Sequence, residues 1–531
     1  MKIRIANLSV TLDDERPIEE LVAEYLKVSR QKILSVKIIR RAVDARRFRG
    51  APIKFNFVVD VDVRGKVKSG QWSVRSEKFS QHTRPTNRYT LSTNPIVVGF
   101  GPAGMFAALT LARAGLEPII FERGGDVDSR TAAVEKFFNG GSLDEKSNVQ
   151  FGEGGAGTFS DGKLTTRLND PLIDFVLKTF VDAGAPEEIL CEQKPHIGTD
   201  NLRGVVKNIR QEILSRGGKI FFNAQVTDVE IVDGKISAVI VNDAERFSAD
   251  VIFFGVGHSA RDTYEMLTRQ KISMAAKNFA VGLRIEHPQE FINSAQYGED
   301  FLNPKLPAAD YLLTFQDKIR GRGAYSFCMC PGGQVVAATS ERGGVVTNGM
   351  SNFARASGVA NSALLVTVGT KDFGDDVLAG VRFQRHIEQL AFFYGGKNFR
   401  APVQSVGDFV NESVGSKNFL VKPSYPIGFT VTNLREILPR EVGNTLADAL
   451  RFFDKKISGF AAADVPLTGV ETRTSSPVRI LRDDVTRQSV SVKNFYPIGE
   501  GAGYAGGITS SAIDGLKSVK TFLSTLEHDD D

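Results

Sequence analysis

The chain has 531 residues, of which 42% are hydrophobic and 24% charged, and its formal net charge is +4. This length suggests about three domains with sizeable cores, and the modest content of 20 prolines excludes collagen-like and low-complexity architectures. Glycine is over-represented, with 51 residues where a share of roughly 7% is typical, and the three cysteines are too few for a disulfide framework.

The N-terminal segment, residues 1–94, is strongly basic, with 20 Lys and Arg against 10 Asp and Glu. Its first residues lack the apolar core of a secretory signal, and together with the few cysteines this predicts a cytoplasmic protein. The polar residues 64–94 predict a linker or a wrapping arm. Apolar spacing predicts a small α/β domain before it, with strands at residues 2–10, 33–39 and 53–63 and a helix at residues 17–26.

A dinucleotide-binding pattern begins at residue 95. Residues 96–98 predict a buried strand, residues 105–114 a helix and residues 117–121 a second strand, with the turn G-x-G-x-x-G between the first two. Gly99 allows the tight exit from the strand, Gly101 lets the backbone approach a pyrophosphate, and Gly104 lets the helix pack closely. Glu122, at the tip of the second strand, is suited to accept hydrogen bonds from a ribose. The charge-free residues 95–112 approach the length of a membrane span, but their two prolines and three glycines favour strand–turn–helix.

Two further glycine-rich segments follow. Residues 152–162 contain five glycines, so their backbone can approach a ring or a phosphate; Ser160, Asp161 and Lys163 are its candidate polar contacts, and a mobile surface loop is the alternative. Residues 494–512 predict a strand that runs into Gly499, Glu500 and Gly501 and then a helix, for which a simple helix cap is the alternative. Thirteen of the 51 glycines lie in these two segments and the first turn.

The C-terminal pattern resembles the second FAD signature of glutathione-reductase-like flavoproteins, in which the acid binds the ribityl chain and the helix N-terminus points at the flavin. Residues 221–226, 228–232, 235–241 and 249–255 predict a strand and a β-meander that returns to a parallel strand. In related flavoproteins such a segment contacts adenine, which points to Val226 here. The glycine turn at Gly257 resembles the one near the pyrophosphate.

Taken together, the chain resembles a mostly uncharacterised group of bacterial FAD-dependent dehydrogenases, often described as NAD(FAD)-utilising. The resemblance extends to residues 255–267 (GVGHSARDTYEML), 279–288 (FAVGLRIEHP), 326–341 (SFCMCPGGQVVAATSE), 346–351 (VTNGMS) and 469–479 (GVETRTSSPVR).

That resemblance implies an α/β fold: a Rossmann-like FAD-binding domain of the glutathione-reductase type, an inserted α+β substrate or cap domain, and the small N-terminal α/β domain. The implied boundaries are 1–94, 95–275 with 475–531, and 276–474. The implied cofactor is FAD, bound by Gly99, Gly101, Pro102, Ala103, Gly104, Glu122, Arg123, Gly154, Gly155, Gly157, Thr158, Ser160, Asp161, Lys163, Val226, Gly257, Gly499, Glu500, Gly501, Gly507 and Ile508.

Four residues are candidates for chemistry beside the flavin. Cys328 and Cys330 form either a redox pair or a buried structural pair, and two cysteines alone do not make a metal site. His258 follows a glycine turn and is placed to reach the cofactor. Arg473, with residues 475–476, is expected to lie over the flavin face.

The predicted function is that of an FAD-dependent oxidoreductase that transfers hydride to or from a small molecule, with NAD(P)H as a transient partner. No second G-x-G-x-x-G turn opens a separate nicotinamide domain, and no C-x₄-C pair of the disulfide-reductase kind occurs near the first motif. Val256-Gly257 stands where aromatic hydroxylases carry an Asp-Gly turn. Two alternatives remain: a flavoprotein that binds or modifies RNA through basic residues such as 46, 47 and 49, and a non-catalytic flavin-binding scaffold.

Overall fold

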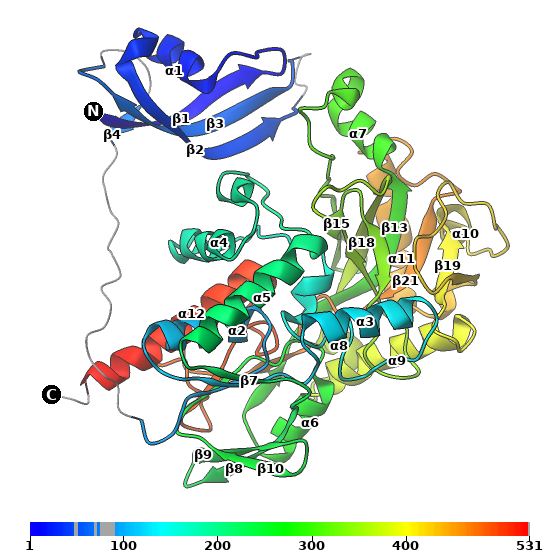
Figure 1. Cartoon of the computed structure of the whole chain (residues 1–531). Coiled ribbons are helices and arrows are strands. Elements are labelled where there is room, and N and C mark those ends of the chain that lie inside the picture. The colour runs from blue at the N-terminus through cyan, green and yellow to red at the C-terminus, as the bar shows by residue number, and fades with distance from the viewer. Residues whose placement is uncertain (47–50, 68–71, 75–90, 529–531) are drawn as a thin grey trace.

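The computed structural model describes residues 1–46, 51–67, 72–74 and 91–528, and these form three main sheets and three smaller ones (Figure 1). The fold is mixed α/β. The predicted arm at residues 64–94 and the basic residues 47 and 49 lie largely outside the described residues. No helix in the described ranges combines the length and the apolar character needed to cross a membrane.

The N-terminal sheet has the strand order β2-β3-β1-β4, with helix α1 (Ile18–Leu26) on one face. Its strands are β1 (Lys2–Thr11), β2 (Ile33–Asp44), β3 (Lys54–Val63) and β4 (Ser73–Val74). Strand β2 runs five residues beyond its predicted end, because as an edge strand it tolerates the charged residues that interrupt its apolar pattern. The backbone of Arg41 hydrogen-bonds to Cys191 and Gln193, which ties this sheet to the rest of the chain.

A parallel five-stranded sheet joins segments from distant parts of the sequence, in the order β23-β11-β5-β6-β7. Its strands are β5 (Ile96–Val98), β6 (Ile119–Phe121), β7 (Lys219–Phe221), β11 (Ile252–Phe254) and β23 (Phe495–Pro497). The last strand therefore returns to the sheet more than 200 residues after β11, as the motif order predicts.

The β-meander is observed with one correction. The predicted strand at residues 221–226 is wrong, because β7 ends at Phe221 and Asn223 adopts a left-handed φ of 53°, which breaks the extended backbone. The meander strands are β8 (Val226–Val232), β9 (Lys235–Val241) and β10 (Glu245–Ser248).

Two layers cover the five-stranded sheet. Alternate residues of its strands point to opposite faces, so Val97 and Phe253 pack against helices while Val98 and Phe254 pack against the β8–β10 sheet. The helical layer consists of α2 (Pro102–Arg113), α4 (Leu172–Asp182), α5 (Thr199–Ser215) and α12 (Ile508–His528).

Residues 279–471 contain a seven-stranded sheet, in the order β14-β15-β18-β13-β21-β19-β20. Its strands are β13 (Phe279–Pro288), β14 (Thr314–Asp317), β15 (Arg322–Cys330), β18 (Val359–Val368), β19 (Ala401–Ser405), β20 (Phe429–Val431) and β21 (Pro466–Glu471). The helices around it are α7 (Gln289–Tyr297), α8 (Thr370–Phe373), α9 (Ala379–Tyr394), α10 (Val406–Val410) and α11 (Arg440–Asp454).

Two short two-stranded sheets accompany the larger ones. Strand β12 (Met274–Ala276) pairs with β22 (Val478–Ile480), so the chain enters and leaves the seven-stranded region side by side. Strands β16 (Gln334–Ala337) and β17 (Thr347–Met350) form a further pair. The remaining α-helices described are α3 (Val127–Phe138) and α6 (Arg261–Arg269). The glutathione-reductase type of the fold and the exact domain boundaries stay predictions.

Candidate functional site

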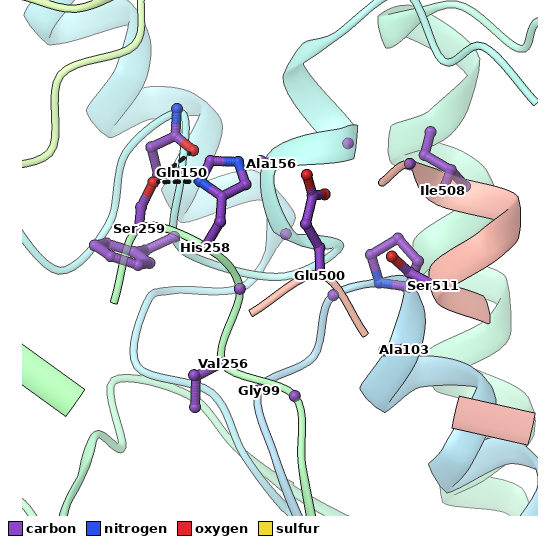
Figure 2. Close-up of a pocket in the computed structure, with 18 of the residues that line it drawn as sticks. Gly99, Ala103, Gln150, Ala156, Val256, His258, Ser259, Glu500, Ile508 and Ser511 are labelled. Carbon is purple, nitrogen blue, oxygen red and sulfur yellow. Dashed lines mark hydrogen bonds between the residues drawn. The ribbon is translucent and has the colours of Figure 1, made fainter. Parts of the chain in front are cut away.

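A cavity of about 390 Å³ lies at the carboxyl ends of β5, β6 and β11 (Figure 2). This edge of a parallel sheet is where α/β proteins bind ligands. Most of the predicted cofactor-binding residues line it: Gly99, Gly101, Pro102, Ala103, Glu122, Arg123, Gly155, Gly157, Ser160, Asp161, Lys163, Val226, Gly257, Glu500, Gly507 and Ile508. The structure does not place Gly104, Gly154, Thr158, Gly499 or Gly501 in the cavity wall.

The first turn has the geometry that its glycines predict. Gly99 has a φ of 87°, and a Cβ there would lie 2.5 Å from the carbonyl oxygen of Gly255 on the neighbouring strand. Helix α2 then begins with Pro102 at its first position. The free N–H groups and partial positive charge of its N-terminus face the cavity, which suits a phosphate.

The glycines outside the wall pack its supporting elements together. A Cβ on Gly104 would lie 1.9 Å from the carbonyl oxygen of Gly99, and one on Gly501 would lie 2.6 Å from that of Gly257. A Cβ on Gly499 would lie 2.6 Å from the Cβ of Ala103. These positions therefore set the close approach of α2 to the sheet and of the C-terminal segment to the Gly257 turn.

The Gly104→Ala variant is expected to bind FAD roughly 10-fold more weakly, or worse. The added Cβ overlaps the carbonyl oxygen of Gly99, and the shift of α2 that relieves the overlap is unfavourable by about 1–3 kcal/mol. FAD retained after gel filtration, and its dissociation constant, measure the effect. Gly204→Ala is the matched control, because Gly204 also lies inside a helix and a Cβ there meets nothing within 4 Å. That control should retain FAD and gain up to about 1 kcal/mol of stability. Equal FAD retention in the two variants would contradict the role given to Gly104.

Glu122 is already a hydrogen-bonding hub within the protein. Its Oε2 accepts from the backbone N–H of Phe100 at 2.7 Å, and its Oε1 accepts from those of Gly124 and Gly152 at 3.0 Å each. The carboxylate thus joins the first turn to the glycine-rich loop as well as lining the cavity. Its contact with a ribose stays a prediction.

The glycine-rich loop is held by Arg130, a residue that the sequence analysis missed. This fully buried side chain on α3 donates to five backbone carbonyls at 2.7–3.2 Å, those of Asn148, Val149, Gly152, Glu153 and Gly155. The sequence did carry a signal, because Arg130 occupies the apolar stripe that Val127, Val134 and Phe137 form on α3. A charged residue in such a stripe indicates a buried partner.

The polar residues at the end of this loop bond mainly to the protein. Burial opposes the ionisation of Asp161, but Lys163 and Arg355 together lower its pKa to about 2. Arg355 donates to Asp161 at 2.6 Å, and the ammonium group of Lys163 donates to the carbonyl of Met329. Ser160 donates to the carbonyl of Gly157 at 2.7 Å. These side chains shape the wall, and their direct contact with FAD stays a prediction.

Glu500 differs from these, because its carboxylate projects into the cavity (Figure 2). No donor among the described residues hydrogen-bonds to it. Burial raises the pKa of Glu500 to about 7. Ile508 and Ser511, at the start of α12, line the same side, so the C-terminal segment presents an acceptor and a helix N-terminus to the same space.

Comparison with known proteins identifies the family and its cofactor. A family model described as "FAD-dependent protein, C-terminal domain-like" matches residues 278–474, and a domain of unknown function matches residues 2–62. An uncharacterised protein of Clostridium beijerinckii is 50% identical over 534 aligned residues, which cover 99% of each chain. The chain belongs to a family of uncharacterised FAD-dependent proteins. FAD is the cofactor of this flavoprotein.

Solved structures resemble the flavoprotein only remotely. The glycerol-3-phosphate dehydrogenase of Bacillus halodurans, complexed with FAD, aligns over 82% of this chain and 64% of its own, with a TM-score of 0.34 and 12% identity. The glycine oxidase of Bacillus cereus aligns over 82% and 96%, with a TM-score of 0.33 and 11% identity. Likenesses of this size carry no conclusion about activity.

The residues of the cavity fit FAD. Two glycine segments approach so closely that a Cβ on Gly155 would lie 2.9 Å from the Cα of Gly101, which leaves backbone rather than side chains facing a pyrophosphate. The N-terminus of α2 would bind its charge, and the carboxylate of Glu500 would accept from ribityl hydroxyls. Val226, at the start of β8, is buried and would lie against the adenine end.

His258 lines the cavity with its tautomer fixed by its neighbours. The hydroxyl of Ser259 donates to Gln150 Oε1 at 3.1 Å and lies 3.0 Å from His258 Nδ1, so Nδ1 must carry the proton and Nε2 is an acceptor. Burial, together with the charges of Arg473 and Arg261, lowers the pKa of His258 to about 3. The imidazole is therefore neutral at physiological pH.

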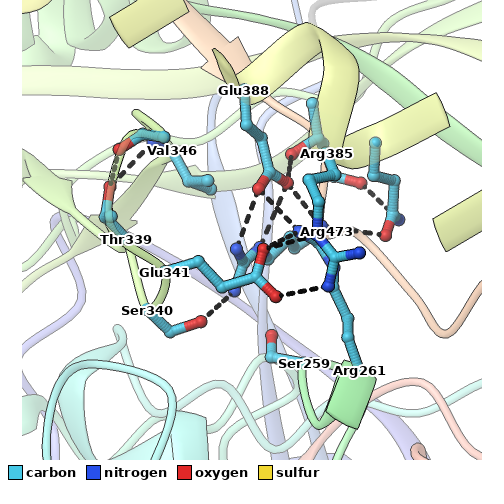
Figure 3. Close-up of polar contacts among 12 residues, drawn as sticks. Ser259, Arg261, Thr339, Ser340, Glu341, Val346, Arg385, Glu388 and Arg473 are labelled. Atoms are coloured by element: carbon cyan, nitrogen blue, oxygen red, sulfur yellow. Dashed lines mark hydrogen bonds and ion pairs between the residues drawn. The ribbon is translucent and has the colours of Figure 1, made fainter. Parts of the chain in front are cut away.

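Arg473 lies in the wall, but its guanidinium is engaged behind it. Glu388 accepts from Arg473 Nη2 at 2.8 Å and from Nε at 3.1 Å, and Ser340 accepts from Nη1 (Figure 3). The same carboxylate accepts two hydrogen bonds from Arg261, at 2.6 and 2.9 Å. Arg473 thus links the segment that follows β21 to α9, and its position over the flavin face stays a prediction.

The two cysteines are placed differently from one another. Cys328 lines the cavity, whereas Cys330 is fully buried behind it. Of the serines predicted to accompany Arg473, Ser475 lines a second cavity and Ser476 is buried against Tyr264. Sequence reasoning did not name Gln150, Asn348 or Ser511 of the cavity wall, although Asn348 lies in the segment 346–351 and Ser511 in the segment 494–512.

Proposed function

We propose that the flavoprotein is an oxidoreductase that transfers a hydride between NAD(P)H and a small-molecule substrate by way of FAD. The observation that carries the proposal is a second cavity, of about 690 Å³, which shares Phe327, Thr474 and Gly506 with the FAD cavity. A reductant or substrate in the second cavity would therefore border the cofactor directly. FAD supplies the hydride chemistry when bound, and the protein supplies position and charge.

The lining of the second cavity favours a ligand with a flat or apolar part and an anionic group. Phe327, whose side chain is 38% exposed, packs edge-to-face on Tyr325 at one wall. Lys371 and Arg322 supply positive charge at another wall, and Arg322 is held by Asp372 at 2.6 Å. Aromatic faces and cations together suit a nicotinamide nucleotide or an aromatic acid.

His258 fits the same proposal as a positioning group for the substrate. With Nδ1–H donated to Ser259, its Nε2 can accept a hydrogen bond from a hydroxyl or amine. A neutral imidazole does not repel the cations of the neighbouring Arg261 and Arg473 pair, so it retains this role across the physiological pH range.

Anaerobic mixing of the FAD-loaded protein with NADH or NADPH tests the proposal. We expect loss of the visible flavin absorbance and its recovery on addition of a suitable acceptor. Lys371→Ala is expected to raise the KM for the effective nucleotide by about 10-fold, equivalent to about 1.4 kcal/mol, without loss of FAD. Lys318→Ala, at an exposed lysine that does not line the cavity, is the control. A protein that holds FAD yet is reduced by neither nucleotide would refute the proposed electron donor.

A further inference from the structure

The two sulfurs of Cys328 and Cys330 stand at the boundary between the FAD cavity and the seven-stranded sheet. Cys328 shares the cavity wall with Gly257, Glu471 and Glu500, and Cys330 lies directly behind it with no exposure. The proposed hydride transfer makes no use of either thiol. Their positions nevertheless put Cys328 in the wall of the cavity and shield Cys330 from solvent.

The strand that carries them is interrupted at this point. Strand β15 pairs with β18 through Phe327 and Ala363 and again through Cys330 and Asn361, so β15 carries one extra residue between the two pairings. Cys328 adopts a left-handed φ of 44°, which is unfavourable by about 1–2 kcal/mol for a residue with a Cβ. A strained, non-glycine residue in the wall of a cofactor cavity is typical of a residue held in place for function.

The thiol of Cys330 contacts the backbone of Cys328. The Sγ of Cys330 lies 3.3 Å from the carbonyl oxygen of Cys328, so it is turned back toward residue 328. A hydrogen bond from Cys330 to Cys328 lowers the pKa of the Cys328 thiol well below its usual value and raises that of Cys330. Both shifts favour ionisation of Cys328 over that of Cys330.

The charges around the pair favour that thiolate. Lys163 Nζ lies 3.8 Å from Cys330 Sγ, and Arg284 Nη1 donates to the carbonyl of Cys328 at 3.0 Å. Lys163 and Arg355 share the carboxylate of Asp161, and Arg284 pairs with Glu471. Lys163, Arg355 and Arg284 thus face the carboxylates of Asp161 and Glu471, and Glu500 lies in the same cavity wall. Burial raises the pKa of both Glu471 and Glu500 to about 7, so these two carboxylates are only partly ionised at neutral pH and the cations are in excess. One thiolate would restore neutrality in this buried cluster.

We propose that Cys328 and Cys330 form a redox-active pair that exchanges two electrons with the bound flavin, an inference that rests on the proposed oxidoreductase function. In the oxidising direction the S–H bond of Cys330 breaks and an S–S bond to the Cys328 thiolate forms. The electron pair and the Cys330 proton pass to the flavin, which is reduced. The reverse step returns the electron pair and proton and restores thiolate and thiol. Lys163 holds the negative charge of the reduced pair.

The electron capacity of the holoenzyme tests this directly. Anaerobic titration with dithionite is expected to consume four electrons per bound FAD in the wild-type protein, two for the flavin and two for the disulfide. Cys328→Ser and Cys330→Ser should each take up two. Cys191→Ser is the matched control and should still take up four, because Cys191 lies outside the cavity, beside the carbonyl of Glu188. Two electrons in the wild-type protein would overturn the pair while leaving the flavin function intact.

A thiol count gives a second readout that needs no variant and no turnover. The chain has three cysteines, so the protein isolated in air and then denatured should present one reactive thiol, and the protein reduced anaerobically should present three. Peptide mass analysis should place the missing pair at residues 328 and 330. Three thiols in the air-isolated protein would overturn the proposal. A protein that takes up neither FAD nor electrons would instead refute the proposed function, and the redox pair with it.

Discussion

The Glu388→Gln variant is expected to be less stable than the wild-type protein by about 3–5 kcal/mol. Glu388 is the common acceptor of Arg261, Arg473 and Thr472, and its hydrogen bonds from the arginines are 2.6–3.1 Å long. All three charged side chains are at most 3% exposed. Loss of the charge leaves two buried guanidinium groups with only the partly exposed Glu341 as a remaining carboxylate nearby.

Urea denaturation of the two proteins at neutral pH measures the difference. Asp376→Asn is the matched control, since Asp376 pairs with Arg382 at 2.6 Å but the two side chains are 63% and 59% exposed. That variant should lose no more than about 1 kcal/mol. If both variants unfold at the same urea concentration, the cluster does not stabilise the junction of α6, α9 and β21.

The same carboxylate sets a pH dependence. Burial opposes its ionisation, but Arg261 and Arg473 hold the pKa of Glu388 well below its usual range. A lowered pKa stabilises the fold above the unfolded-state value of about 4.3, and this contribution is lost as the pH falls below it. The Gln variant should therefore show a smaller loss of stability between about pH 5 and about pH 2 than the wild-type protein.

The Arg130→Met variant is expected to lose both stability and FAD. Its guanidinium donates to five carbonyls of the glycine-rich loop, and hydrogen bonds to a charged group contribute about 1.5–3 kcal/mol each before any relaxation. Without it the carbonyls of residues 148–155 are left unsatisfied and the loop should leave the cavity wall. We expect a loss of about 3–5 kcal/mol and a fall in FAD affinity of at least 100-fold.

Two control variants show whether the planar set of donors of Arg130 is what matters, rather than its positive charge or any change on helix α3. Arg130→Lys retains the charge but not the planar set of donors, so it should lose FAD almost as severely. Lys136→Met, at an exposed position on the same helix, should retain FAD and stability. FAD content after gel filtration and the urea midpoint are the measurements. Tight FAD binding by Arg130→Met would show that the loop is held by its other contacts.

The local sequence pattern predicted many of the strands, helices and turns, because these depend mainly on residues that are close together in the chain. The turn at Gly99, Gly101 and Gly104 follows from the conformational freedom of glycine between an apolar strand and a helix, and the structure has it at the expected place. The predicted strand at residues 221–226 was wrong because one residue, Asn223, has a left-handed backbone conformation. Asn adopts this conformation more readily than most residues, but the apolar periodicity of the sequence does not reveal it.

The division between sequence and tertiary structure follows the range of the interactions. The sequence by itself determined the α/β class, the segments that meet at the cavity and, through family membership, FAD. Only the tertiary structure decided that Arg130 binds the glycine-rich loop, that Arg473 pairs with Glu388, and that Lys163 reaches the thiol pair from 167 residues away in the chain. Backbone conformation depends on near neighbours, whereas the partner of a buried charge depends on which distant segments pack against it.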